Sequence, residues 1–150
     1  MHKKNTLKAL TQILEIRGVQ KELAEIDVFK ANKEEAARLD ERKAAEEQLK
    51  MRQGLWLEYM DQKDIIPELI AGLSRDVVVG DSALTDRNKQ HGFAKNKSQI
   101  KVELWKLSEA RVRQTQQLQK NVKREIFKRK EEENLRRTEE RTSYNWGAYD

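Results

Sequence analysis

The sequence is short of the residues that shape compact folds. It contains no cysteine, one proline and six glycines in 150 residues, and aromatic residues make up only 6%. The missing cysteines exclude disulfide bonds and thiolate metal sites. Because turn residues are this scarce and 38% of the chain is charged, the composition argues against a turn-rich globular domain and favours long helices with little core.

Long hydrophobic runs are missing as well. No stretch of 18 apolar residues occurs, so we expect no membrane insertion. Lys8, Gln12 and Glu15 interrupt the apolar opening stretch, which therefore makes a poor signal peptide. We expect a cytoplasmic protein.

Helix-forming residues fill most of the chain. They predict one helix over about 6–73 and a second over about 93–141, followed by a frayed tail at 142–150. Between the helices, residues 74–92 contain a β-branched run, an internal glycine, three aspartates and a closing glycine, which predict the connection. A short helix within it, capped by Asp81 or Ser82, is an alternative.

The fold class is therefore all-α: a single elongated two-helix antiparallel coiled-coil hairpin over residues 1–150. Facing residues of such a hairpin have position numbers with a constant sum. Trp56 with Trp105 and Leu49 with Val112 both add to 161, which places the fold-back at Gly80 and Asp81. The predicted seam on the first helix consists of Ile16, Val19, Leu23 and Ile26.

The opening stretch carries a second apolar stripe, formed by Leu7, Leu10 and Leu14, which one partner helix cannot cover together with the seam. A sum of 161 also makes the first helix overhang the second. Three alternatives could cover the exposed apolar surface of the opening stretch: docking on a larger protein, self-association, or a folded-back tail that packs Tyr144, Trp146 and Tyr149 against it.

Spaced leucines leading into LTQILEIRGVQKELAEID, one break and a Glu/Arg-rich second helix resemble the FliJ/YscO family of flagellar and virulence type III secretion. The residues that carry the resemblance are Leu10, Ile13, Leu14, Ile16, Arg17, Gln20, Leu23 and Ala24. Members of this family are helical hairpins similar to the γ stalk of rotary ATPases. The resemblance implies a non-catalytic stalk or adaptor whose end with both termini docks in a hexameric export ATPase, while the other end approaches the cytoplasmic domain of the export gate. Some members also handle export chaperones.

Two sets of partner-binding residues follow. The resemblance implies that the apolar opening stretch faces the ATPase ring, through Leu7, Leu10, Ile13, Leu14, Ile16 and Arg17. Position and residue type suggest a contact with the export gate or a chaperone through Leu55, Trp56, Tyr59, Phe93 and Ile100.

Chemistry-bearing residues are sparse, and we expect neither an enzyme nor a cofactor or metal site. His2 and His91 are too far apart in sequence for a local metal pair. Asp76, Asp81 and Asp86 lack the spacing of a calcium loop and suit turns and helix caps.

The last third of the chain, residues 101–150, holds 13 basic and 9 acidic side chains. Its basic face consists of Arg111, Arg113, Lys120, Lys123, Arg124 and Lys128. A solvated surface, an acidic protein partner and nucleic acid phosphates all suit such a face. For a stalk we do not expect nucleic acid as a partner. A basic helical nucleic-acid-binding protein and an escort for export chaperones are the alternative functions.

Overall fold

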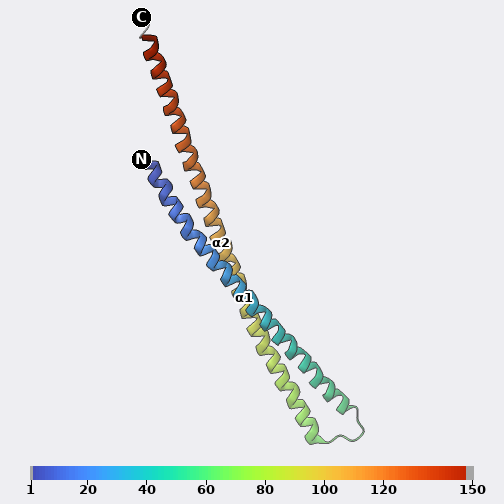
Figure 1. The fold of residues 1–150 in the computed structure, drawn as a ribbon. Coiled ribbons are helices and arrows are strands. Elements are labelled where there is room, and N and C mark those ends of the chain that lie inside the picture. The colour runs from blue at the N-terminus through green and yellow to red at the C-terminus, as the bar shows by residue number, and fades with distance from the viewer. Residues whose placement is uncertain (1, 148–150) are drawn as a thin grey trace. The chain divides into compact units, whose positions relative to one another are not determined.

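Two long helices make up the structure, a computed structural model that describes residues 2–147. Helix α1 spans His2–Met60 and helix α2 spans Pro67–Gly147, with 59 and 81 residues. Residues 61–66 connect them, and no strand occurs among the described residues (Figure 1). The prediction of an all-α, two-helix hairpin is confirmed.

Pro67 fixes where the second helix begins. Proline lacks the backbone N–H that a first helical residue leaves unpaired, and its ring disfavours a helical residue before it. The Ile66 carbonyl accepts the first bonds of α2, from the N–H groups of Leu69 (3.1 Å) and Ile70 (3.2 Å). The Ile66 N–H donates to the Tyr59 hydroxyl oxygen at 2.9 Å, so the connection is tied back to the end of α1.

The predicted connection at 74–92 is wrong, because these residues form part of α2. Neither Asp81 nor Ser82 caps a helix there, and no separate short helix forms. Val77 and Gly80 are half-buried and buried on the side of α2 that faces α1, where a β-branched residue and a glycine pack closely instead of turning the chain. The second helix also continues past the predicted end at residue 141 to Gly147, while residues 148–150 lie outside the described part.

The chain divides into two compact units. Unit 1 contains the start of α1, to Leu23, and the part of α2 from Lys106 onward, and unit 2 contains Ala24–Trp105. In each unit the covered positions recur at alternating steps of three and four residues, which is the spacing of a coiled-coil seam.

Most of the buried positions in the seam of unit 2 are small residues. They are Ala31 (3% exposed), Ala94 (5%), Ser98 (5%) and Gly80, and Leu49 (7%) is the large one. A Cβ atom placed on Gly80 would lie only 3.2 Å from Leu49 Cδ1, so the helices approach closely at this glycine. Small residues at a helix contact allow such an approach.

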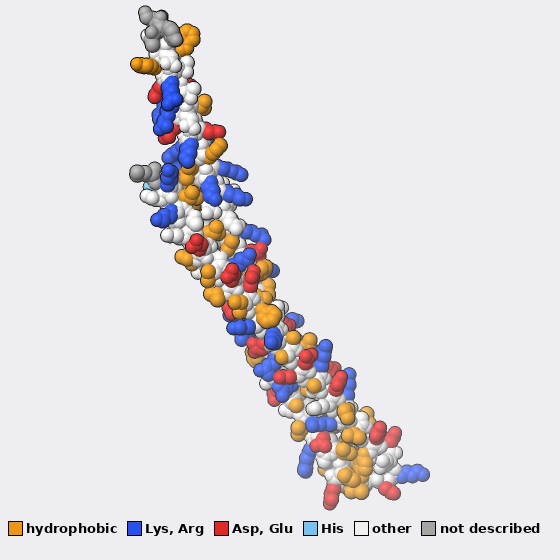
Figure 2. Space-filling view, viewed as in Figure 1, with side chains coloured by type: hydrophobic (Ala, Val, Ile, Leu, Met, Phe, Trp, Pro, Cys, Tyr) orange, Lys and Arg blue, Asp and Glu red, His pale blue; other side chains and the backbone are white. Residues whose placement is uncertain are grey.

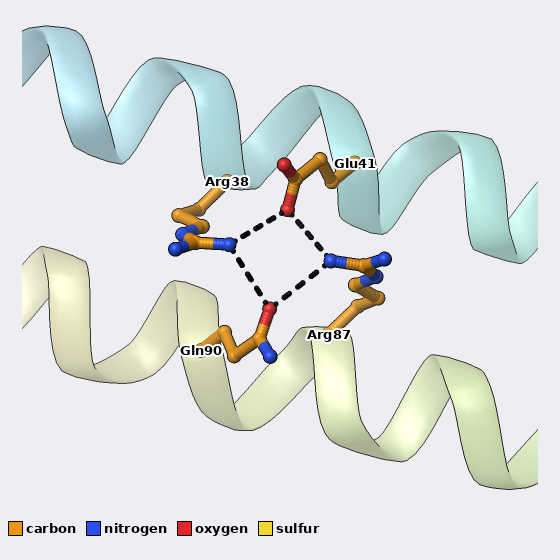
Figure 3. A network of polar contacts seen from close by, with 4 residues as sticks. All are labelled: Arg38, Glu41, Arg87 and Gln90. Atoms are coloured by element: carbon orange, nitrogen blue, oxygen red, sulfur yellow. Dashed lines mark hydrogen bonds and ion pairs between the residues drawn. The ribbon is translucent and has the colours of Figure 1, made fainter.

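Polar contacts fix the register of unit 2. Glu41 Oε2 accepts from Arg87 Nη1 at 2.9 Å and from Arg38 Nη1 at 3.1 Å, and Gln90 Oε1 accepts from both arginines at 3.2 Å (Figure 3). Exposed ion pairs contribute little free energy, on the order of 1 kcal/mol or less. Their effect here is to favour one register, because any shift along the helix breaks the closed arrangement.

The predicted sum of 161 is wrong, since the position numbers of contacting residues add to about 130 in both units. Asn32 contacts Ser98 in unit 2, and Thr11 contacts Gln119 in unit 1. The tryptophans are not paired with each other: Trp56 Nε1 donates to Ser74 Oγ at 3.1 Å and Trp105 Nε1 to Glu25 Oε1 at 3.2 Å. The predicted seam is also wrong, because its four residues are 48–59% exposed: Ile16, Val19, Leu23 and Ile26.

Unit 1 has a more polar seam. Its seam positions, all half-buried or buried, are Lys3, Leu7, Leu10, Leu14, Arg17 and Lys21 on α1, and Ser108, Val112, Thr115, Gln119, Val122 and Ile126 on α2; Gly18 and Glu109 beside them are half-buried as well. Thr115 is 1% exposed, and its Oγ1 accepts from Arg17 Nη1 at 2.7 Å and donates to the Arg111 carbonyl at 2.9 Å.

The overhanging helix is α2, opposite to the prediction. Lys3 pairs with Glu125, and α2 continues beyond this pair (Figure 1). Residues 131–147 are all exposed. Their acidic and basic side chains alternate in short blocks, with glutamates three or four residues before arginines, and such spacing supports a helix without a partner.

Candidate interaction surfaces

The residues predicted to face an ATPase ring fall into two groups. Leu7, Leu10 and Leu14 are half-buried in the seam of unit 1, and so is Arg17, whose Nη1 also donates to the Arg111 carbonyl at 3.2 Å. These four residues pack between the two helices of unit 1, so α2 covers the apolar stripe of the opening stretch.

Ile13 and Ile16 are the two ring-facing candidates that remain available. They are 40% and 59% exposed, and each directly precedes a seam position of α1. In an antiparallel pair, residues that precede seam positions lie on the same flank of both helices. Three more exposed apolar residues share this property in unit 1, so we define the apolar flank as Ile13, Ile16, Leu23, Leu107 and Leu118.

The tail does not fold back onto the opening stretch. Tyr144 is 80% exposed and Trp146 is 75% exposed, and both lie on the overhanging end of α2. Tyr149 lies outside the described residues. The alternative in which the tail covers Leu10, Ile13 and Leu14 is wrong for Tyr144 and Trp146, and α2 itself covers Leu10 and Leu14.

A second apolar surface lies where α1 ends and α2 begins, in unit 2. It consists of Leu57, Met60, Ile65, Ile66 and Leu69, which are 42–59% exposed, and we call it the apolar tip. Figure 2 shows hydrophobic side chains gathered at this end of unit 2. The nearby charged residues are mostly acidic: Glu58, Asp61, Asp64 and Glu68, with Lys63 as the one cation between positions 57 and 69.

The residues predicted to contact an export gate are not brought together. Leu55 is 54% exposed near the apolar tip, whereas Trp56 and Tyr59 are half-buried and make the hydrogen bonds described above. Phe93 (74% exposed) and Ile100 (59%) lie further along α2, each beyond Ser74, the hydrogen-bond partner of Trp56. Sequence reasoning missed the apolar tip because it placed the connection elsewhere.

The predicted basic face is exposed along α2. Arg113 pairs with Glu109 four residues earlier, and Arg111 and Lys128 are exposed. Lys120 and Lys123 each directly follow a seam position, so they lie on the flank opposite to the apolar flank, with Arg124 beside them. Figure 2 shows Lys and Arg side chains gathered around the N-terminal part of α1 and the adjacent α2 of unit 1.

A neighbouring cation shifts the pKa of Glu125. The Lys3 ammonium donates a hydrogen bond to Glu125, and this bond, with the attraction between the two charges, lowers the pKa of the Glu125 carboxyl below its ordinary value. The interpretation of Asp76, Asp81 and Asp86 as turn and cap residues is wrong, because all three are exposed within α2. His2 is exposed at the start of α1, and His91 is half-buried on α2.

Among the described residues, no helix combines the length and the apolar character needed to cross a membrane. Comparison of the chain with protein-family models, with curated proteins and with solved structures finds no match in any of the three.

Proposed function

We propose that this chain is a non-catalytic helical stalk or adaptor of a type III export apparatus. Its end with both termini docks in a hexameric export ATPase, and its apolar tip contacts the cytoplasmic domain of an export gate. The observation that carries this proposal is the apolar flank of unit 1, where five large apolar side chains are 40–59% exposed. Exposed apolar surface of this kind usually marks a site of protein association.

The mechanism is mechanical and asymmetric. A single pair of helices inside a ring of six subunits cannot contact all subunits equally, so it can favour one arrangement of their nucleotide states over the others. The overhanging end of α2 extends the surface available to such a ring without disturbing the seam, because residues 131–147 are all exposed.

The choice of variants follows from the seam. Replacing Leu10 or Leu14 by aspartate would place a carboxylate in the half-buried seam and destabilise unit 1, so a loss of binding would not distinguish a lost contact from a lost fold. Ile13 and Ile16 are exposed, and Ile13→Asp with Ile16→Asp changes the apolar flank while leaving the seam intact. Val78→Asp with Val79→Asp is the matched control, since these residues are 68% and 59% exposed in unit 2.

The test measures ATP turnover by a purified hexameric export ATPase with each form of the protein. Stimulation by the unchanged protein and by the Val78/Val79 variant, together with its loss in the Ile13/Ile16 variant, supports docking through the apolar flank. Equal stimulation by all three forms contradicts that site, and no stimulation by any form contradicts the stalk function.

The gate contact is tested separately. Ile65→Asp with Leu69→Asp should abolish co-purification with the cytoplasmic domain of an export gate, because both side chains belong to the apolar tip. The Val78/Val79 variant should still co-purify. Retention by the Ile65/Leu69 variant would place the gate contact elsewhere.

A further inference from the structure

Unit 1 concentrates positive charge to a degree that the sequence alone did not reveal. Residues 2–23 and 106–130, which form its paired part, carry 14 Lys and Arg against 4 Asp and Glu. The corrected register brings the lysines of the opening stretch beside the basic segment of α2. The predicted face on α2 is therefore one half of a larger surface.

Two helices contribute to this surface. Lys4 and Lys8 directly follow the seam positions Lys3 and Leu7 on α1, and Lys120 and Lys123 directly follow Gln119 and Val122 on α2. Residues that follow seam positions share one flank of an antiparallel pair. The hydrogen bond from Gln119 Nε2 to Thr11 Oγ1, at 3.1 Å, places this flank of α1 against α2. We define the basic flank as Lys4, Lys8, Lys120, Lys123 and Arg124.

The cations of the basic flank are available for a ligand. All five are exposed, and within residues 2–147 none of them forms an ion pair with an acidic side chain. Lys3 instead uses Glu125 on the other flank. Phe127 also directly follows a seam position and is 63% exposed, so an aromatic ring stands among the cations.

We propose that the basic flank binds the phosphate backbone of nucleic acid, with Phe127 as a stacking platform for a base. The proposal does not rest on the export function. Lysine predominates among the five cations, and lysine is depleted in protein–protein interfaces, whereas contacts from Lys and Arg to phosphates supply most of the affinity in nucleic acid binding. Base stacking on exposed aromatic rings adds sequence-tolerant affinity.

Two other polyanionic partners suit the basic flank less well. Binding to an anionic membrane surface is favoured by an apolar face beside the cations. The five residues of the apolar flank lie on the opposite flank, and Phe127 supplies a single ring beside the basic flank. An acidic protein surface would be expected to meet Arg-rich, aromatic-rich anchors, and Arg124 is the one arginine in this cluster.

The experiment measures the binding of a fluorescein-labelled 20-nucleotide oligothymidine to the full chain by fluorescence anisotropy over a series of salt concentrations. If all five cations contact phosphates, the slope of log K against log salt should be about −3.5 for a single strand, so doubling the salt weakens binding roughly tenfold. Lys123→Gln with Arg124→Gln should reduce the slope to about −2. Lys89→Gln with Lys95→Gln, which removes two exposed cations of α2 in unit 2, is the matched control and should leave the slope unchanged.

Further arms separate the sources of the signal. Phe127→Ala should weaken single-strand binding by roughly fivefold or more, and it should affect binding to a 20-base-pair duplex less, because the bases of a duplex are already stacked. Poly-glutamate at equal charge concentration should fail to displace the oligonucleotide. No binding at 50 mM salt, equal displacement by poly-glutamate, an equal loss in the Lys89/Lys95 control, or preferential binding to vesicles of one-third phosphatidylserine would overturn the proposal.

Discussion

Thr115 provides a sharp test of the polar seam in unit 1. The residue is 1% exposed, and its hydroxyl accepts from Arg17 Nη1 at 2.7 Å and donates to the Arg111 carbonyl at 2.9 Å. Thr115→Val keeps the shape of the side chain and removes both hydrogen bonds. A hydrogen bond to a charged group contributes about 1.5–3 kcal/mol, and a neutral one about 1 kcal/mol.

The expected cost is smaller than the sum of these values. Arg17 is only half-buried and keeps its second bond, to the Arg111 carbonyl at 3.2 Å, so water can replace part of what it loses. The Arg111 carbonyl lies within a helix and keeps its backbone hydrogen bond. We therefore expect Thr115→Val to lower the free energy of unfolding by about 2 kcal/mol, which for a chain of this length corresponds to a fall in Tm of roughly 4–8 °C.

Urea and thermal unfolding followed by far-UV circular dichroism measure this change. Arg17→Met and the double variant complete a double-mutant cycle, in which we expect a coupling of about 1 kcal/mol or more between the two side chains. Thr138→Val is the matched control, because Thr138 lies on the exposed end of α2 and its Oγ1 donates to the Asn134 carbonyl of the same helix, so this variant should have little effect. Equal effects of Thr115→Val and Thr138→Val, or no coupling with Arg17, would refute the reasoning.

Three further predictions follow from the packing and the charges. In urea unfolding, Gly80→Leu should lower the free energy of unfolding by roughly 1–3 kcal/mol, because a Cβ at this position meets Leu49 and Arg52 at 3.2–3.3 Å. Gly54 has nothing within 4 Å of such a Cβ, so Gly54→Leu should raise the free energy of unfolding by up to about 1 kcal/mol. Similar effects at both sites would contradict the close approach of the helices at Gly80. Because Lys3 lowers the pKa of Glu125, this carboxylate stabilises the folded state at pH values above the ordinary glutamate pKa, and the effect is lost as the pH falls through the lowered pKa. Lys3→Met should therefore raise the pKa of Glu125 in an NMR titration. An unchanged pKa would contradict the pairing of Lys3 with Glu125. Deleting residues 131–150 should leave the Tm of the remaining chain unchanged, since residues 131–147 are all exposed, and a clear fall would show that the overhang is packed.

The helical class was predictable from composition, but the register was not. Apolar periodicity drew attention to Ile16, Val19, Leu23 and Ile26, which have the spacing of a seam yet are exposed. The real seam places Lys3, Arg17 and Lys21 among its leucines. Long basic side chains can cover a seam with their methylene stems, so a search for apolar residues alone selects the wrong face.

The position of the connection was also misread for a physical reason. Gly80 and Val77 resemble turn residues in the sequence, whereas in the structure they allow close contact with α1. Pro67 was the informative signal, because it suits the first position of a helix and disfavours the interior. The interaction surfaces depend on these two facts: a register near 130 places Lys4 and Lys8 beside Lys123, and a connection at 61–66 exposes the apolar tip.

Disulfide crosslinking tests the register most directly, because the natural chain has no cysteine. One variant, with Leu49→Cys and Gly80→Cys, carries cysteines at two positions that lie against each other in the structure. A second variant, with Leu49→Cys and Val112→Cys, carries them at two positions that a sum of 161 would pair. A disulfide requires Cα atoms within roughly 7 Å. Under mild oxidation at low protein concentration, we predict an intramolecular crosslink in the Leu49/Gly80 variant and none in the Leu49/Val112 variant, read by mass spectrometry. Crosslinking of the Leu49/Val112 variant without crosslinking of the Leu49/Gly80 variant would contradict the register, and with it the basic flank and the apolar tip.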